Sequence, residues 1–348
     1  MTLDALAFEP HFLDHIAPVW RALPQGARGR LLVDRDLQLD ARAEARGIEA
    51  EAVSGSQIRM SSPPPKARAG DGPLALVASI GDMKIARRLG YRRFVFIEHG
   101  MAQSYSGTGR SPIEASYSGG PDREDVVLFL VPNKHAAGRW RATYPQTPVE
   151  VVGCPKLETL PARDAGPAPV VCISFHWNTP LVGLPPEAGN ALGEFRPILP
   201  DLAVRFPDLI GHAHPRHAKE MARIYRLAGI PFVEDFEEVC RRADVYVCDN
   251  SSTIFEFAST GRPVVLMNAK QYRRHVHHGL RFWEAASVGV QVDDKADLAS
   301  CIDRALSDPP EQQAAREAAL SVVYAYRGNA ANRAAAAILE HIGEAVAA

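Results

Sequence analysis

The sequence has 348 residues, of which 46% are hydrophobic, and a formal net charge of −2. This length exceeds what one ordinary core holds and predicts two domains, and the near-neutral charge without a Lys/Arg block argues against a dedicated nucleic-acid binder. The N-terminus lacks a basic start and an apolar signal core, and no apolar run approaches the ~20 residues needed to span a bilayer. We therefore expect a cytoplasmic protein.

The five cysteines predict buried thiols. Their number is odd, no pair has CxxC spacing, and most stand in apolar contexts that are typical of strands or helices. Disulfides and a structural zinc site are therefore not expected.

The first half of the chain alternates between strand and helix patterns. After a helix over 11–22 and a Pro/Ser/Gly-rich loop over 60–73, the apolar run 93–97 completes a β-α-β unit. Apolar strands of this kind indicate a parallel sheet covered on both faces. The other elements expected in this half are strands over 30–34, 74–78, 126–131 and 148–153 and helices near 40–46, 82–89 and 134–144.

A second series of strands and helices follows a Pro/Ala-rich linker over 161–169. We therefore expect an α/β protein with one domain over 1–160 and another over 161–348, and the last helix is a candidate to pack back on the first domain. The expected strands are 170–174, 208–211, 230–233, 245–247, 263–267 and 288–292, and the expected helices are 219–227, 236–242, 254–259, 295–306 and 310–342.

His99 lies just past the strand over 93–97, after Glu98, and Gly100 comes next. Ligands of open parallel sheets bind beyond the carboxyl ends of the strands, so a titratable residue at this point is a candidate for catalysis. A histidine that only caps the sheet edge explains the pattern equally well. His176 and Asn178 follow the strand over 170–174 and are further candidates for a ligand cleft.

A cluster of cationic and imidazole groups follows the expected strand over 208–211. It contains His212, His214 and Arg216, with Pro215 between the last two. Arginine presents a planar fork that suits phosphate oxygens, and imidazole can accept a proton or stabilise an anion. The His-x-His-Pro spacing is not a specific metal signature, so we expect phosphate binding and no metal.

The stretch 244–265 is typical of a strand, a polar turn and the start of a helix. The turn contains Asn250, Ser251, Ser252 and Thr253, and Glu256 lies one helical turn further on. Unpaired backbone N–H groups and the helix dipole favour an anion there, and Glu256 can accept hydrogen bonds from a ribose. An ordinary helix cap is the alternative.

Four landmarks in order resemble a known family: His99-Gly100, Gly153-Cys-Pro-Lys-Leu-Glu158, His214-Pro-Arg216 and the stretch 249–263. The series is similar to the CDP-glycerol glycerophosphotransferases, the family of wall teichoic acid polymerases and primases. It resembles more loosely the GT-B glycosyltransferases and the non-hydrolysing UDP-N-acetylglucosamine 2-epimerases. Ile97-Glu98 before the His-Gly pair, and Lys156 and Glu158 later, depart from the family pattern.

The resemblance implies a GT-B-like fold of two Rossmann-like, doubly wound domains facing an interdomain cleft. The N-terminal domain would take the acceptor, and the C-terminal domain would hold a nucleotide-activated donor without a cofactor or an obligatory metal. His99 would be the catalytic base, His214 and Arg216 would lie at the donor phosphates, and Ser251 and Ser252 would bind the pyrophosphate.

The resulting hypothesis is a transferase that moves a glycosyl or polyol-phosphate group to an acceptor hydroxyl. The acceptor would be a glycan, a polyol-phosphate polymer, a lipid-linked precursor or a protein. Peripheral membrane contact is compatible with this hypothesis, and we expect no nucleic-acid partner. The alternatives are a sugar-nucleotide epimerase and a non-catalytic nucleotide-sugar or glycan-binding protein on a degenerate transferase fold.

Overall fold

A computed structural model describes residues 2–61, 72–101, 105–106, 118–177, 190–249, 251–268, 277–278 and 286–347. The chain forms two compact units. The first contains residues 1–103, 108–159 and 324–348, and the second contains residues 104–107 and 160–323. The C-terminal stretch from Tyr324 onward thus groups with the first unit.

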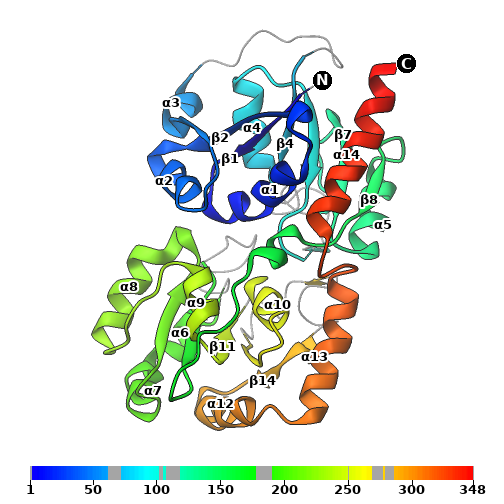
Figure 1. Cartoon of the computed structure of the whole chain (residues 1–348). Helices are drawn as coiled ribbons and strands as arrows, with labels where there is room; N and C mark the ends of the chain where they lie inside the picture. Colours follow the sequence, from blue (N-terminus) through cyan, green and yellow to red (C-terminus); the bar gives the residue numbers. More distant parts are fainter. Residues whose placement is uncertain are drawn as a thin grey trace. The chain divides into compact units, whose positions relative to one another are not determined.

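The first unit is built on a seven-stranded sheet in the order β3-β2-β1-β4-β5-β7-β8, in which every neighbouring pair is parallel (Figure 1). The order reverses at β1 and β4, as in dinucleotide-binding folds, where ligands bind beyond the carboxyl ends of the strands. The strands are β1 (Leu3–Ala7), β2 (Arg28–Asp34), β3 (Glu51–Val53), β4 (Leu74–Val77), β5 (Arg93–Ile97), β7 (Val126–Val131) and β8 (Val149–Val151).

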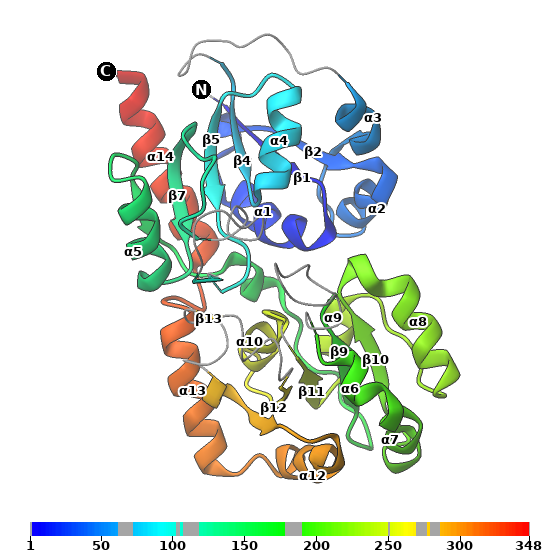
Figure 2. The same cartoon turned by 180° about the vertical axis from the view of Figure 1, so that it is seen from behind.

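Helices cover both faces of this sheet, as Figures 1 and 2 show from opposite sides. On one face, α1 (Pro10–Ala22) and α14 (Ala330–Ala347) pack on an apolar layer that includes Leu13, Ile16 and Ile338. On the other face, α4 (Ile80–Arg88) and α5 (Lys134–Thr143) pack through residues such as Met83 and Trp140. The short helices α2 (Leu39–Glu44) and α3 (Gly55–Met60) follow β2 and β3.

The second unit has a five-stranded parallel sheet in the order β10-β9-β11-β12-β14. Its strands are β9 (Val171–Phe175), β10 (Ile210–Ala213), β11 (Val245–Cys248), β12 (Val264–Met267) and β14 (Val290–Val292). The prediction of a strand over 230–233 is wrong, because this segment forms only an isolated parallel bridge, between Phe232 and Gly211. Pro231 leaves this segment without the N–H that a continuous ladder would use at that position.

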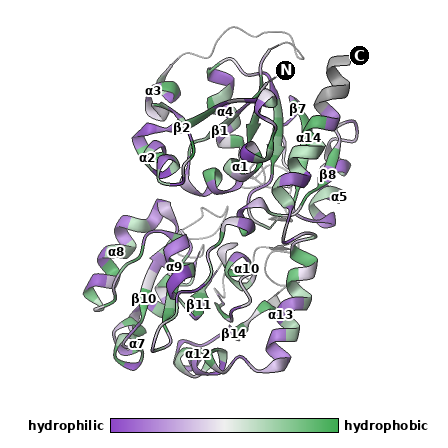
Figure 3. Cartoon of the chain, in the orientation of Figure 1, coloured by the Kyte–Doolittle hydropathy of each residue, from purple (hydrophilic) through white to green (hydrophobic). Residues whose placement is uncertain are grey.

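The helices of the second unit are α6 (Leu192–Phe195), α7 (Leu199–Arg205), α8 (Ala218–Leu227), α9 (Phe236–Arg242), α10 (Thr253–Ala258), α12 (Leu298–Ser307) and α13 (Pro310–Val323). Hydrophilic and hydrophobic residues both occur along α8 (Figure 3), and its apolar side packs on β10. An antiparallel pair of two-residue strands, β6 (Tyr105–Ser106) and β13 (His277–His278), is also described.

The single helix expected over 310–342 is instead two helices, α13 and α14. The chain leaves helical geometry between them, and Asn329 takes a left-handed backbone angle of φ 62° just before α14 begins. Asparagine tolerates this conformation better than most residues. The break allows α14 to pack on the first unit while α13 remains with the second.

All five cysteines are free thiols, as the sequence predicts, and four of them are buried, whereas Cys301 is half-buried. Across the described helices, none combines the length and the apolar character that crossing a bilayer requires.

Candidate functional site

In the first unit, His99 stands two residues beyond β5, whose last four side chains are buried. Its ring nitrogen Nδ1 lies 2.7 Å from the carbonyl oxygen of Ala78, just past β4. A carbonyl can only accept, so Nδ1 carries the proton and the lone pair of the neutral ring is on Nε2. This is the tautomer that a general base needs.

Helix α1 surrounds the His99 ring with aromatic side chains. The ring centroid of Phe12 lies 4.8 Å from that of His99, and those of His11 and His15 lie at 5.9 and 6.4 Å. Pro10 at the first helical position starts α1 directly after Glu9, whose carboxylate lies 3.7 Å from the Nδ1 atom of His11. The carboxyl edge of this sheet therefore holds several titratable groups next to His99.

Glu98 and His99 have different surroundings. The buried Glu98 carboxylate accepts a hydrogen bond from the hydroxyl of Ser118, and burial raises its pKa to about 7. The nearby Arg123 is fully buried, with its guanidinium 5.6 Å from the ring centroids of both Phe96 and Trp140, and burial lowers its pKa to about 10. Sequence reasoning noted Glu98 only as a departure from the family pattern, because burial of a single carboxylate leaves no local signal.

In the second unit, the strands β10, β9 and β11 are neighbours, so their carboxyl ends meet at one edge of the sheet. His176 and Trp177 follow β9, His214 and Arg216 follow β10, and Asp249 follows β11. Residues more than 70 positions apart in the sequence are thereby brought together.

The side chains after β9 and β10 form a compact cluster. The rings of His176 and His214 are 5.4 Å apart, the ring of Trp177 is 6.0 Å from that of His214, and the Arg216 guanidinium lies 5.2 Å from the Trp177 ring. The backbone N–H of Arg216 donates to Nδ1 of His214 at 3.2 Å. Since Nδ1 accepts, the neutral His214 ring carries its proton on Nε2 and can donate it to an anion.

Asp249 is an acceptor that the sequence reasoning missed. It is fully buried, and its two carboxylate oxygens accept hydrogen bonds from the backbone N–H groups of His176 and Ala191, each at 2.8 Å. The carboxylate therefore ties the segment after β9 and the start of α6 to the end of β11. An aspartate in a strand-to-helix turn is common, which is why sequence reasoning assigned Asp249 only to the turn.

The polar turn before α10 is organised by its own hydroxyls. The Ser251 Oγ atom accepts from the backbone N–H of Thr253 at 3.3 Å and from its hydroxyl at 2.7 Å, and the Thr253 hydroxyl also lies 3.0 Å from that of Tyr246. Ser252 is the N-cap residue, but its side chain makes no capping hydrogen bond. Glu256, the candidate ribose acceptor, is only 2% exposed.

Of the remaining candidates, His212 is an internal residue of β10, since that strand extends to Ala213 and not only to Gly211 as expected. It is 5% exposed, its Nδ1 atom lies 2.9 Å from the Val233 carbonyl, and its ring packs near Phe236. These contacts are those of a core histidine. Asn178 and Asn250 lie outside the described residues, and Gly100 adopts a left-handed φ of 73° directly after His99.

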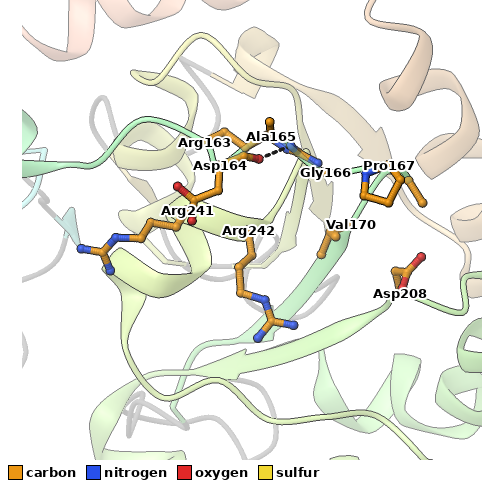
Figure 4. Close-up of a pocket in the computed structure, with 10 residues that line it drawn as sticks. Arg163, Asp164, Ala165, Gly166, Pro167, Val170, Asp208, Arg241 and Arg242 are labelled. Atoms are coloured by element: carbon orange, nitrogen blue, oxygen red, sulfur yellow. Dashed lines mark hydrogen bonds between the residues drawn. The ribbon is translucent and has the colours of Figure 1, made fainter.

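A cavity of about 210 Å³ lies at the opposite, amino edge of the second sheet (Figure 4). Its lining includes Arg163, Arg241 and Arg242. Arg163 forms an ion pair with Asp244, and Arg241 lies 3.8 and 3.5 Å from Glu237 and Glu238. Because two of the three arginines have acidic partners and the cavity is at the wrong end of the strands for an α/β ligand site, we do not assign the chemistry to it.

No set of three or more His, Cys, Asp or Glu side chains within the described ranges is arranged to hold a metal ion.

The fold matches solved structures over nearly its whole length. A putative UDP-N-acetylglucosamine 2-epimerase from Listeria monocytogenes is 14% identical with a TM-score of 0.60, and the alignment covers 99% of this chain and 98% of that one. The S. aureus MnaA–UDP structure is 13% identical with a TM-score of 0.62, covering 100% and 97%. The wall teichoic acid polymerase TagF is 11% identical with a TM-score of 0.62, covering 99% and 90%.

These likenesses confirm the predicted GT-B-like fold with two Rossmann-like units. The resemblance to a transferase family is confirmed as well, since residues 208–340 match the family model described as CDP-glycerol:poly(glycerophosphate) glycerophosphotransferase. The match over residues 208–340 supports the expectation of a glycosyl- or glycerophosphotransferase, and the solved structures support its GT-B-type fold. No curated protein matches the chain at a significant level.

Proposed function

We propose that this protein transfers a glycerol-phosphate-type group from a nucleotide-activated donor to an acceptor hydroxyl without a metal. The observation that carries the proposal is the cluster of His176, Trp177, His214 and Arg216 at the carboxyl ends of β9 and β10. His214 and Arg216 also lie within the residues that match the glycerophosphotransferase family.

The donor phosphates would bind at this cluster. Arg216 supplies a permanent positive charge and a planar set of donors, and His214 supplies an N–H from Nε2. Backbone N–H groups around Ser251 and Ser252 would add further donors at the start of α10. Together these groups offer the positive potential that a metal ion provides in other phosphoryl-transfer sites, which supports transfer without a metal.

His99 would act on the acceptor. Its Nε2 atom would take the proton of an acceptor hydroxyl, whose oxygen then attacks the phosphorus that carries the glycerol. The bond from that phosphorus to the bridging oxygen breaks, and the nucleoside monophosphate leaves with the bonding electrons. His214 and Arg216 would stabilise the negative charge that grows on this leaving group.

The identity of the released nucleotide tests this proposal. With CDP-glycerol and a short glycerol-phosphate oligomer in the presence of EDTA, we expect release of CMP and lengthening of the oligomer by mass spectrometry. Release of a nucleoside diphosphate from nucleotide sugars, with no reaction of CDP-glycerol, would indicate a glycosyltransferase instead. Interconversion of a nucleotide sugar without any acceptor would indicate an epimerase, whose fold this chain shares.

Two substitutions test the assigned roles. His99→Ala should abolish CMP release and leave the affinity for CDP nearly unchanged. Arg216→Ala should weaken CDP binding in calorimetry about tenfold or more, since a hydrogen bond to a charged group contributes roughly 1.5–3 kcal/mol. Arg226→Ala, which removes an exposed arginine from the end of α8, is the matched control and should bind CDP like the original protein. Equal affinity of the two arginine variants would refute the phosphate role of Arg216.

A further inference from the structure

His15 is a histidine on α1 that the sequence reasoning did not single out. It is 2% exposed and lies among apolar residues of the same helix, such as Leu13 and Ile16. Both of its ring nitrogens have partners. Nε2 lies 3.3 Å from the backbone nitrogen of Gly100, and Nδ1 lies 3.7 Å from the sulfur of Cys154.

These contacts define the protonation of the ring. A backbone N–H can only donate, so the Nε2 atom of His15 must be the acceptor, and the proton of the neutral ring is on Nδ1, directed at Cys154. Burial, followed by the positive charge of Lys156 and then by His99, lowers the pKa of His15 well below its ordinary value. The ring is therefore neutral near pH 7 and always available to accept from Gly100.

The residue that His15 holds is part of the turn that carries His99. Gly100 has a φ of 73°, a left-handed conformation that glycine adopts without the steric cost of a side chain. Three contacts fix this turn from three elements. Ala78 after β4 accepts from the His99 ring, His15 accepts from the Gly100 N–H, and the side chain of Asn133 before α5 donates to the carbonyl of Met101 at 3.2 Å.

We propose that His15 is a positioning residue, which accepts the Gly100 N–H and thereby fixes the orientation of the His99 imidazole. The proposal rests on the role of His99 as the base of the proposed function. Because its two nitrogens are occupied by Gly100 and Cys154, His15 takes no part in proton transfer itself. A side-chain acceptor at this place makes a hydrogen bond that the apolar residues around it on α1 cannot make.

Two substitutions at this position separate positioning from packing. His15→Gln retains an acceptor near the place of Nε2, because the amide oxygen of glutamine ends a side chain of similar reach. His15→Leu fills the space and removes the acceptor, which leaves the Gly100 N–H without this partner. Ile16→Val, which shortens a fully buried neighbour on the same helix, is the control for a loss of stability alone.

The measurements are kcat and KM for the donor, the melting temperature, and the exchange rate of the Gly100 amide in protein made with isotope-labelled glycine. We expect His15→Leu to lower kcat about tenfold to a hundredfold with little change in KM, since small misplacements of a catalytic group have effects of this size. Its Gly100 amide should exchange faster. His15→Gln should restore both kcat and the slow exchange of the Gly100 amide, and Ile16→Val should lower only the melting temperature.

Each contrary result is decisive. Equal kcat values for the leucine variant and Ile16→Val would show that His15 only packs, and loss of activity in His15→Gln would show that the imidazole itself moves a proton. If the original protein turns over no donor, the proposed function fails, whereas the Gly100 exchange rates still report whether His15 holds the turn. Unchanged exchange in His15→Leu overturns the inference independently of activity.

Discussion

At the scale of single residues, two neighbours in the sequence have different roles. The His99 ring lies against α1, and the Ala78 carbonyl accepts a hydrogen bond from its Nδ1 atom and so determines the tautomer of the ring. Glu98, one position earlier, is buried near Ser118 and Arg123, where its carboxylate is poorly solvated. The environment of Glu98 predicts a strong dependence of stability on pH.

The pKa of Glu98 in the folded protein is about 7, above its ordinary value of 4.5 because of burial. The folded state therefore holds this proton more tightly than the unfolded state, and stability falls as pH rises from about 4.5 to about 7 and stays reduced above. The reduction is about 3 kcal/mol at most, from the size of the shift.

Glu98→Gln, which stays uncharged and can still accept from Ser118, should remove this loss. We expect the variant to be more stable than the original protein at pH 8, and the difference to shrink toward pH 5. Urea unfolding of both proteins across this pH range measures the difference. A constant difference in stability at every pH would contradict the assignment.

At the scale of elements, the cluster that we propose as the donor site depends on how the ends of β9 and β11 and the start of α6 are joined. Asp249, directly after β11, accepts one hydrogen bond from the backbone N–H of His176 after β9 and another from that of Ala191 before α6, and the His176–His214 cluster begins at the first of these. The orientation of the cluster therefore depends on the Asp249 carboxylate.

Asp249→Asn places an NH₂ group opposite one of the two backbone N–H donors. We expect a loss of roughly 1–3 kcal/mol in the free energy of unfolding, and weaker binding of CDP. Asp4→Asn is the matched control, since both oxygens of Asp4 also accept hydrogen bonds, from Arg30 and Tyr91 in the first unit. Denaturation should show a loss in both variants, and calorimetry should show weaker CDP binding only for Asp249→Asn.

The sequence predicts most of the elements, because the apolar runs 93–97 and 126–131 coincide with β5 and β7, and the helical spacing of the apolar residues in 236–242 coincides with α9. It fails where the signal is short. The strand β1, which lies between β2 and β4 inside the first sheet, is missed because Asp4 interrupts its four apolar residues.

The site is predicted in part for the same reason. Strand ends point to His99 and His214, but the partners His15 and Asp249 act through long-range hydrogen bonds that no local pattern reveals. His212 shows the converse error, since a two-residue shift of the strand boundary places it inside β10.

At the scale of the whole molecule, α14 completes the first unit although it follows the second unit in the sequence. It packs against α1, and Ala334 and Ile338 belong to the same buried layer as Leu13 and Ile16. The core of the first unit is therefore made of segments that are more than 300 residues apart.

Ile338→Ala should destabilise the first unit by roughly 2–5 kcal/mol, because it leaves a cavity in a buried layer. Leu339→Ala is the control, since Leu339 is the next residue on the helix and is 42% exposed, whereas Ile338 is 2% exposed. Hydrogen exchange of α1 should become faster in the first variant and remain unchanged in the second. Similar exchange in both would mean that α14 contributes little to this core.

The position of α14 also has a consequence for synthesis on the ribosome. All residues of the second unit, 104–107 and 160–323, emerge before α14. The second unit is therefore available to fold while the sheet of the first unit still lacks one of its covering helices. Domains generally fold as units during translation, and exposed apolar surface invites aggregation in the meantime. The apolar layer around α1 therefore stays partly uncovered in the nascent chain until α14 has emerged.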